Sequence, residues 1–139
     1  MKKALIDTNI ALDILLNRKP FYEKSIAVLV LAEKGIISGY ISASAITDIF
    51  YLSQKDLGKK DAKEALKKLF TAFKPATVTD NHIYQAFDLD WDDFEDSVQY
   101  IVGESLSVDY IVTRNTKDYI SSTIPAVTPQ EFIQVISVI

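Results

Sequence analysis

Short apolar runs alternate with longer amphipathic stretches along the 139 residues of the chain. Brief runs bounded by turn signals predict strands, and stretches in which apolar residues recur every three or four positions predict helices. Strands are expected at residues 3–6, 39–41, 77–78, 108–113 and 126–127. Helices are expected at residues 9–16, 20–34, 59–73 and 80–89, and also from Ser42 or Ser44 to about residue 58, from the segment 92–96 onward, and after residue 128.

Residues that typically begin or end helices support these boundaries. Gly35 is a natural helix stop, and Pro75 ends the strongly amphipathic stretch before it. Thr128 and Glu131 form the pattern of a capping box, with Pro129 at the first helical position. Because strands and helices alternate, we expect an α/β fold, a parallel sheet flanked by helices, in one domain that covers residues 1–139.

Composition excludes several classes of site and location. The chain has no Cys, so it can form no disulfide, zinc–thiolate site or cysteine nucleophile. The longest apolar run, residues 26–32, is far shorter than the roughly 20 residues of a membrane helix, and Asp7 and Asn9 interrupt the start of a signal-like N-terminus. We therefore expect a soluble, cytoplasmic protein. A net charge of −4 argues against nucleic acid, unless the acids gather around a metal ion.

Four acidic residues and one asparagine form the candidate site. Asp7 directly follows the first strand, Asp48 lies one turn into the helix after the second, and Asp96 lies in the first turns of a later helix. Asn115 and Asp118 follow the strand that ends at residue 113. Because the carboxyl ends of parallel strands share one edge of a sheet, these side chains can converge there.

Converged carboxylates require a neutralising partner. At roughly 4 Å and an effective dielectric of about 20, each like-charged pair costs about 4 kcal/mol. Protonation of one acid or a bound cation relieves this repulsion. Oxygen ligands without His or Cys favour Mg²⁺ or Mn²⁺, and such an ion suits hydrolysis of a phosphodiester. Alternatively, Asp93, Glu95 and Asp96 only favour the start of a helix, and Asp48 is only a solvated helix residue.

Other catalytic arrangements find little support. His82 is the only histidine, and the sequence has neither a nucleophile elbow nor a glycine-rich phosphate loop. We interpret His82 as a surface or packing residue. The lysines between residues 55 and 68 are interpreted as a solvated helix face. The apolar stripe of residues 55–73 is wide enough for contact with a second copy of the chain or with another protein, although packing within the domain is the default.

Four segments together resemble the PIN domain family of metal-dependent ribonucleases. They are Leu5-Ile6-Asp7-Thr8-Asn9, residues 41–48, residues 93–99 and residues 109–119. The resemblance covers essentially the whole chain and implies a three-layer α/β/α fold with a central, mainly parallel sheet. Many similar members are VapC-like toxins of toxin–antitoxin pairs, so it also implies an RNA substrate, an antitoxin partner and a homodimer.

The resemblance also assigns roles to residues. It implies that Asp7 and Asp96 bind Mg²⁺ or Mn²⁺, and that Asp48 occupies a position where relatives often carry Glu. Many relatives have Asp where this chain has Asn115, and Asp118 lies three residues further on. We also expect Thr8, Asn9 and Thr113 to support the metal ligands. Arg114 is expected either to contact the RNA backbone or to be a surface residue.

The leading hypothesis from the sequence is therefore a Mg²⁺- or Mn²⁺-dependent endoribonuclease that acts as a toxin. The alternative is a catalytically weak or inactive PIN-like module that binds RNA or protein, because Asn115 carries no charge and the pI is near 4.9. A phosphatase or phospho-receiver domain also places Asp after its first strand. Phosphatases of the haloacid dehalogenase type require a second Asp where this chain has Asn9.

Overall fold

A five-stranded, fully parallel sheet forms the centre of the computed structural model, which describes residues 1–138. Its strand order is β3-β2-β1-β4-β5, so the first strand lies in the middle. The strands are β1 (Lys2–Ile6), β2 (Ile37–Ser42), β3 (Phe73–Ala76), β4 (Tyr110–Val112) and β5 (Ala126–Val127). The predicted parallel sheet is thus confirmed.

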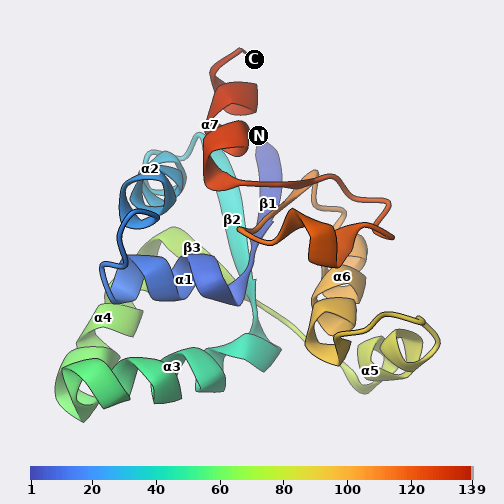
Figure 1. Ribbon diagram of the computed structural model, residues 1–139, viewed down its shortest axis with the longest axis horizontal. Helices are drawn as coiled ribbons and strands as arrows, with labels where there is room; N and C mark the ends of the chain where they lie inside the picture. Colours follow the sequence, from blue (N-terminus) through green and yellow to red (C-terminus); the bar gives the residue numbers. More distant parts are fainter. Residues whose placement is uncertain (139) are drawn as a thin grey trace.

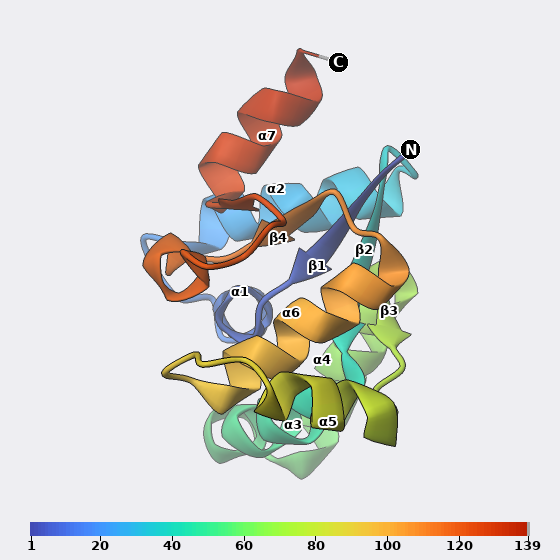
Figure 2. The same cartoon turned by 90° about the vertical axis from the view of Figure 1, so that its right-hand side faces the viewer.

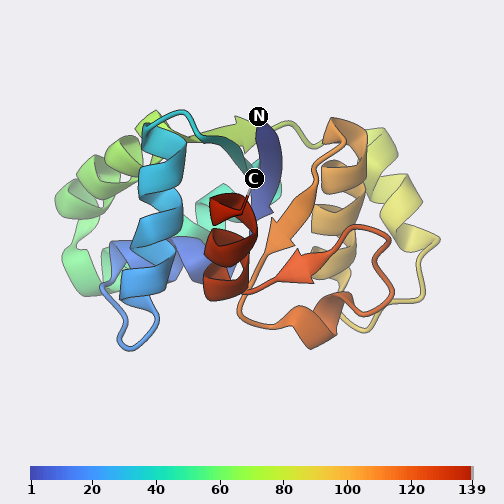
Figure 3. The same ribbon diagram turned by 90° about the horizontal axis from the view of Figure 1, so that it is seen from above.

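Helices cover both faces of this sheet (Figures 1 and 3). One face packs against α1 (Thr8–Leu15), α2 (Tyr22–Glu33), α3 (Ala43–Leu57), α4 (Lys59–Ala72) and α7 (Pro129–Ser137). The other packs against α6 (Phe94–Leu106), on which α5 (Asp80–Phe87) lies (Figure 2). A short 3₁₀ helix, η1 (Thr116–Tyr119), follows β4. The three-layer α/β/α arrangement implied by the resemblance is confirmed.

Strand β1 is buried on both faces, which explains its unbroken apolar run. Ala4 and Ile6 point into the core beneath α1, whereas Leu5 points into the core beneath α6, and all three are fully buried. Successive side chains of a strand face opposite sides, so a central strand between two helical layers needs apolar residues at every position. Asp7 is the first residue after the carboxyl end of β1, so it is the first polar side chain beyond this buried run.

The third strand differs from the prediction. Residues 77–78 form no strand; β3 is Phe73–Ala76, and α4 ends at Ala72. Phe73 is fully buried against the core, and Pro75 is tolerated because β3 lies at the edge of the sheet, where a missing N–H group leaves no ladder bond broken. The predicted strand at 126–127 and the capping box at Thr128 are confirmed.

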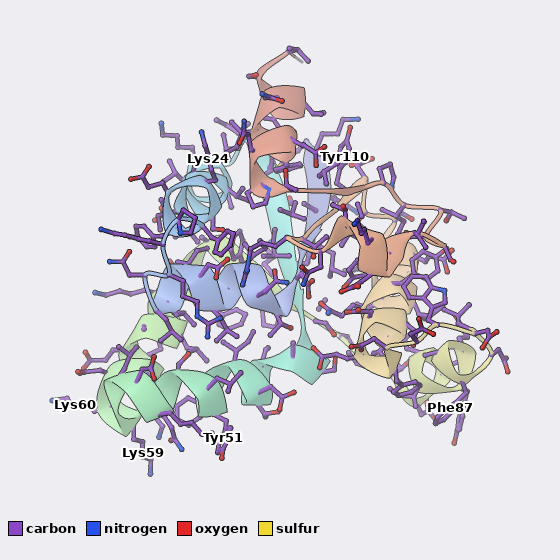
Figure 4. The ribbon with its side chains drawn as sticks, in the orientation of Figure 1. Lys24, Tyr51, Lys59, Lys60, Phe87 and Tyr110 are labelled. Carbon is purple, nitrogen blue, oxygen red and sulfur yellow. The ribbon has the colours of Figure 1, made fainter. Side chains whose placement is uncertain are left out.

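The lysines between residues 55 and 68 are exposed, as the sequence pattern predicted. Lys59 and Lys60 point away from the molecule at the corner between α3 and α4 (Figure 4). The apolar stripe of α4 contributes Ala62, Leu66 and Leu69 to the core, so this part of the stripe packs within the domain. None of the helices within residues 1–138 is long and apolar enough to cross a membrane.

Candidate metal centre

Asp7 lies at the carboxyl edge of the sheet, where β1 passes into α1. It is the N-cap of α1, and its side chain is buried, with 6% exposed. Strand β4 is the parallel neighbour of β1, so Thr113, directly after β4, lies beside Asp7. The backbone N–H of Asp7 donates to the carbonyl of Val112 at 3.0 Å, and Thr113 Oγ1 donates to Asp7 Oδ2 at 2.7 Å. The pairing of two strands therefore sets this contact.

Further donors hold both oxygens of the Asp7 carboxylate. Oδ1 accepts from the backbone N–H of Thr8 at 2.7 Å and from Gln99 Nε2 at 3.0 Å. Oδ2 accepts a longer bond of 3.5 Å from Asn9 Nδ2, in addition to the Thr113 bond. A carboxylate offers about four acceptor positions, so these donors fix its orientation. Thr8, Asn9 and Thr113, which the sequence analysis proposed as supporting residues, all contact Asp7.

Asp96 approaches the same region from the opposite helical layer. It lies in the first turn of α6, whose N-cap Asp93 accepts from the backbone N–H of Asp96 at 3.1 Å. Its own Oδ1 accepts from the hydroxyl of Tyr119 in η1 at 3.1 Å. That hydroxyl accepts in turn from Gln99 Nε2 at 3.4 Å. A continuous chain of hydrogen bonds thus connects Asp7 to Asp96.

The electrostatics of this region favour a cation. Burial and, to a lesser extent, the charges of Asp7, Asp93 and Asp118 together raise the pKa of Asp96 to about 7, against the hydrogen bond from Tyr119. Burial also raises the pKa of Glu95, with the charges of Asp48, Asp93 and Asp7 acting in the same direction. A bound cation would oppose these effects, because it stabilises the ionised carboxylates.

Tyr119 remains a hydrogen-bond donor at any physiological pH. Burial and the neighbouring charges of Asp7 and Asp96 hold the pKa of its hydroxyl well above the usual range. The residue is 3% exposed, and its ring packs edge-on against Trp91, with 5.9 Å between the ring centroids. The orientation of the hydroxyl toward Asp96 is therefore set by packing as well as by hydrogen bonding.

The other predicted acids flank this pair. Asp118 and Asp96 line a hollow of about 170 Å³ together with Trp91 and Lys117. Asp48 is exposed on α3, and its charge reaches Glu95, which accepts from Thr8 Oγ1 at 3.2 Å. The charges of Asp7 and Asp118 thus both act on Asp96, whereas the charge of Asp48 acts on Glu95.

Asn115 contributes mainly through its backbone. It is the N-cap residue of η1, and its N–H donates to Thr113 Oγ1 at 3.1 Å. Its side chain is exposed and makes no hydrogen bond within residues 1–138. Between the two candidates for the fourth acidic position, only Asp118 adds charge near Asp96.

Arg114 has a partner within the protein. Its Nε lies 2.8 Å from Oδ2 of Asp13, a fully buried carboxylate on α1, and its guanidinium lies 4.0 Å from the ring centroid of Phe21. Burial raises the pKa of Asp13, against the charge of Arg114. His82 also has a local role: its Nδ1 accepts from the backbone N–H of Thr79 and completes the capping box of α5.

Sequence reasoning did not assign roles to Gln99, Tyr119 or Asp13. Gln99 carried a usable signal, since it is a polar residue one turn after Asp96 in a helix that is otherwise apolar there. Asp13 carried a similar signal, because it follows Ile10, Ala11 and Leu12 on a buried helix. Tyr119 had no such signal, because tyrosine is common in both cores and surfaces.

The donor set fits Mg²⁺ or Mn²⁺. Within residues 1–138, no three Asp, Glu, His or Cys side chains are grouped closely enough to enclose a metal ion. The protein instead offers the carboxylate pair of Asp7 and Asp96, joined by hydrogen bonds. Mg²⁺ is usually held by one or two carboxylates, with waters and substrate phosphates as its other ligands, rather than by a complete protein cage.

Comparison with known families identifies the class of protein. The model of the PIN domain family matches residues 3–117, which include β1, β4 and the residues that connect Asp7 to Asp96 except Tyr119. The chain therefore belongs to the PIN domain family. No match was found among curated proteins.

Solved structures share the fold at low sequence identity. The toxin VapC20 of Mycobacterium tuberculosis, described as cleaving the sarcin–ricin loop, is 15% identical with a TM-score of 0.61, over 78% of this chain and 86% of its own. VapBC2 of Rickettsia felis, bound to a promoter DNA fragment, is 13% identical with a TM-score of 0.66, over 90% and 96%. FitAcB of Neisseria gonorrhoeae is 16% identical with a TM-score of 0.64, over 91% and 98%.

Proposed function

We propose that this PIN domain is a Mg²⁺- or Mn²⁺-dependent endoribonuclease. The observation that carries the proposal is the hydrogen-bonded connection between Asp7 and Asp96 at the carboxyl edge of the sheet. The two carboxylates are held together at a ligand-binding edge, and the pKa of Asp96 is raised to about 7, so a bound cation would stabilise the ionised form of Asp96.

The residues have distinct proposed roles. Asp7 and Asp96 would hold the ion, and Asp48 with Asn115 or Asp118 would complete the acidic surface around it. When bound, the ion supplies Lewis-acid chemistry that activates water and stabilises the charge developing on a phosphodiester. Thr8, Asn9 and Thr113 orient the carboxylate of Asp7 through the bonds that they donate, and would hold it ready to bind the ion. The carboxylates themselves would orient the attacking water or accept its proton.

RNA and an antitoxin are the proposed partners. VapC20 is described as a toxin that cleaves the sarcin–ricin loop, and VapBC2 and FitAcB are neighbours in fold. By that likeness we propose that this protein cuts RNA as the toxin of a toxin–antitoxin pair, and that it works in the cytoplasm as a homodimer. A small reading frame for an inhibitor beside its gene would support this proposal.

Cleavage of RNA with and without EDTA tests the enzymatic assignment. Wild-type protein is expected to cleave RNA with Mg²⁺ or Mn²⁺ and to lose that activity in EDTA. Asp7→Asn and Asp96→Asn are each expected to abolish cleavage while remaining folded by circular dichroism. Asp88→Asn, at an exposed acid beyond α5, is the control and should retain activity. Undiminished cleavage by both site variants would refute the assignment.

A non-catalytic PIN-like module that binds RNA or protein is the second candidate. It is favoured by the lack of a three-acid cluster within residues 1–138 and by the uncharged side chain at Asn115. Calorimetric titration with Mn²⁺ separates the two candidates. An enzyme should bind the ion and lose that binding in Asp7→Asn, whereas a degenerate module should bind none.

A further inference from the structure

We propose that Gln99 and Tyr119 are positioning residues that hold Asp7 and Asp96 ready for a divalent ion. The two side chains form one hydrogen-bonded connection between the carboxylates, hereafter the Gln99–Tyr119 bridge. This inference rests on the proposed function, because it concerns the assembly of the same metal centre. It adds two residues that bind no metal themselves.

The direction of each hydrogen bond in the bridge is fixed by chemistry. An ionised carboxylate can only accept, so the amide nitrogen of Gln99 must face Asp7 Oδ1, at 3.0 Å. The same nitrogen reaches the hydroxyl oxygen of Tyr119 at 3.4 Å with its second hydrogen. The hydroxyl then gives its single hydrogen to Asp96 Oδ1 at 3.1 Å. Both amide hydrogens of Gln99 and the hydroxyl hydrogen of Tyr119 are therefore donated to other members of this path.

The bridge joins three separate parts of the chain. Asp7 lies between β1 and α1, Asp96 and Gln99 lie one turn apart on α6, and Tyr119 lies in η1. Gln99 is fully buried and Tyr119 is 3% exposed. Because packing restricts both side chains, the bridge can fix the relative placement of two carboxylates that come from opposite helical layers of the fold.

The glutamine has a cost that favours this interpretation. Its Oε1 is buried and has no hydrogen-bond partner within residues 1–138. An unsatisfied buried carbonyl disfavours folding, and an apolar side chain of similar length would avoid that penalty. The amide is therefore poorly explained by packing alone. The two hydrogen bonds that the amide donates, to Asp7 and to Tyr119, give a functional reason for a glutamine at this position.

The bridge leaves one oxygen of Asp96 open to a metal ion, whereas both oxygens of Asp7 also accept from Thr8, Asn9 or Thr113. It occupies one oxygen of each carboxylate, Oδ1 of Asp7 and Oδ1 of Asp96. Within residues 1–138, Oδ2 of Asp96 accepts no hydrogen bond. Outer hydrogen bonds of this kind orient metal ligands, and their removal typically weakens metal binding by about 10- to 100-fold.

Calorimetric titration of the metal-free protein with Mn²⁺ tests the bridge. Tyr119→Phe removes one hydroxyl, and Gln99→Met removes the amide while keeping the unbranched shape. Each is expected to weaken Mn²⁺ binding by at least about tenfold. The double variant should weaken it little more than the stronger single change, since either substitution already breaks the path.

Tyr100→Phe is the matched control. Tyr100 adjoins Gln99 on α6, is 5% exposed, and its hydroxyl bonds to Glu104 at 3.0 Å and Thr123 at 2.9 Å, away from Asp7 and Asp96. This variant loses a buried hydroxyl and should bind Mn²⁺ as the wild type does. An equal loss of affinity in Tyr100→Phe would overturn the proposal, because it would show a general effect of destabilisation.

The outcomes separate this inference from the proposed function. If wild-type protein binds no Mn²⁺, the proposed function fails. If wild-type protein binds Mn²⁺ and Tyr119→Phe binds it within about twofold, the enzyme assignment stands and the bridge is refuted. Effects of the two substitutions that multiply in full in the double variant would refute a single connected path. Tyr119→Phe alone decides the matter if Gln99→Met does not fold.

Discussion

Arg114 Nε lies 2.8 Å from Oδ2 of Asp13, and this ion pair joins two elements that carry the candidate metal centre. Arg114 follows Thr113 at the end of β4, and Asp13 is on α1, which begins directly after Asp7. Asp13 is fully buried, whereas the side chain of Arg114 is 26% exposed. The sequence suggested an RNA contact for Arg114, which stays a prediction. The structure gives the residue an internal partner that explains its presence without RNA.

Arg114→Met is expected to lower the free energy of unfolding by about 3 kcal/mol, because it leaves a buried carboxylate without its cation. The double variant Asp13→Leu/Arg114→Met should be more stable than Arg114→Met alone, since it removes the unpaired charge as well. Urea denaturation measures both. Lys117→Met, at an exposed cation three residues away, should change stability by less than about 0.5 kcal/mol. A small effect of Arg114→Met would show that the pair contributes little.

The stability of the metal-free protein is expected to depend on the ionisation of Asp96. Its pKa is about 7 in the folded protein, against about 4 in an unfolded chain. Between these values the folded state holds a proton that the unfolded state has lost, so stability falls as pH rises from about 4 to 7. Asp96→Asn removes this contribution. We therefore expect the variant to gain stability over wild type as pH rises through that range.

Urea unfolding in EDTA at pH 5 and pH 8 measures this difference. Comparing the variant with wild type at each pH cancels the contributions of other acids, including Glu95 and Asp13, whose pKa values are also raised. Saturating Mn²⁺ should then stabilise wild type at pH 8, by about 2.7 kcal/mol at 100 times the dissociation constant, and should leave Asp96→Asn little changed. A difference that does not vary with pH would contradict the raised pKa.

Thr113→Val is expected to destabilise the protein and to release the carboxylate of Asp7. Thr113 is fully buried, and its hydroxyl both donates to Asp7 Oδ2 at 2.7 Å and accepts from the N–H of Asn115 at 3.1 Å. A hydrogen bond to a charged group contributes roughly 1.5–3 kcal/mol, so the loss should lie in that range. Thr113→Ser keeps the hydroxyl and should retain most of the stability and RNA cleavage. Equal losses in both variants would assign the effect to packing instead.

The sequence predicted most of the fold because the pattern of β1 and of the helices is unambiguous. A fully apolar run such as residues 4–6 predicts a central strand, and Asp7 directly after it predicts a polar edge. The prediction failed at β3 because Pro75 and Phe73 were assigned to the end of a helix. Only the tertiary position of that segment, at an edge of the sheet, makes a strand with proline acceptable.

The candidate site was predictable only in part. Asp7, Asp96 and Thr113 could be placed at one edge because the carboxyl ends of parallel strands and the helices that follow them converge there. Gln99 and Tyr119 could not be linked to them, because 20 residues separate the two and η1 has no periodic pattern. Nor could the sequence tell that Asp13 would be buried against Arg114, since the pair spans 101 positions and depends on how α1 packs beside the loop after β4.

The ring of Phe73 on β3 occupies the space that a side chain at Gly39 on β2 would need. The two residues are register partners, and a Cβ atom added at Gly39 would lie 2.5 Å from Cδ1 and 2.8 Å from Cε1 of Phe73. Because Phe73 is fully buried, its ring cannot move away without disturbing the core. Gly39→Ala is therefore expected to cost roughly 1–3 kcal/mol of unfolding free energy. In the Gly39→Ala background, Phe73→Leu should cost less than it does in wild type, since the smaller side chain relieves the clash. Urea denaturation of the four proteins gives this coupling, and strictly additive effects would show that the glycine is not there to admit the ring.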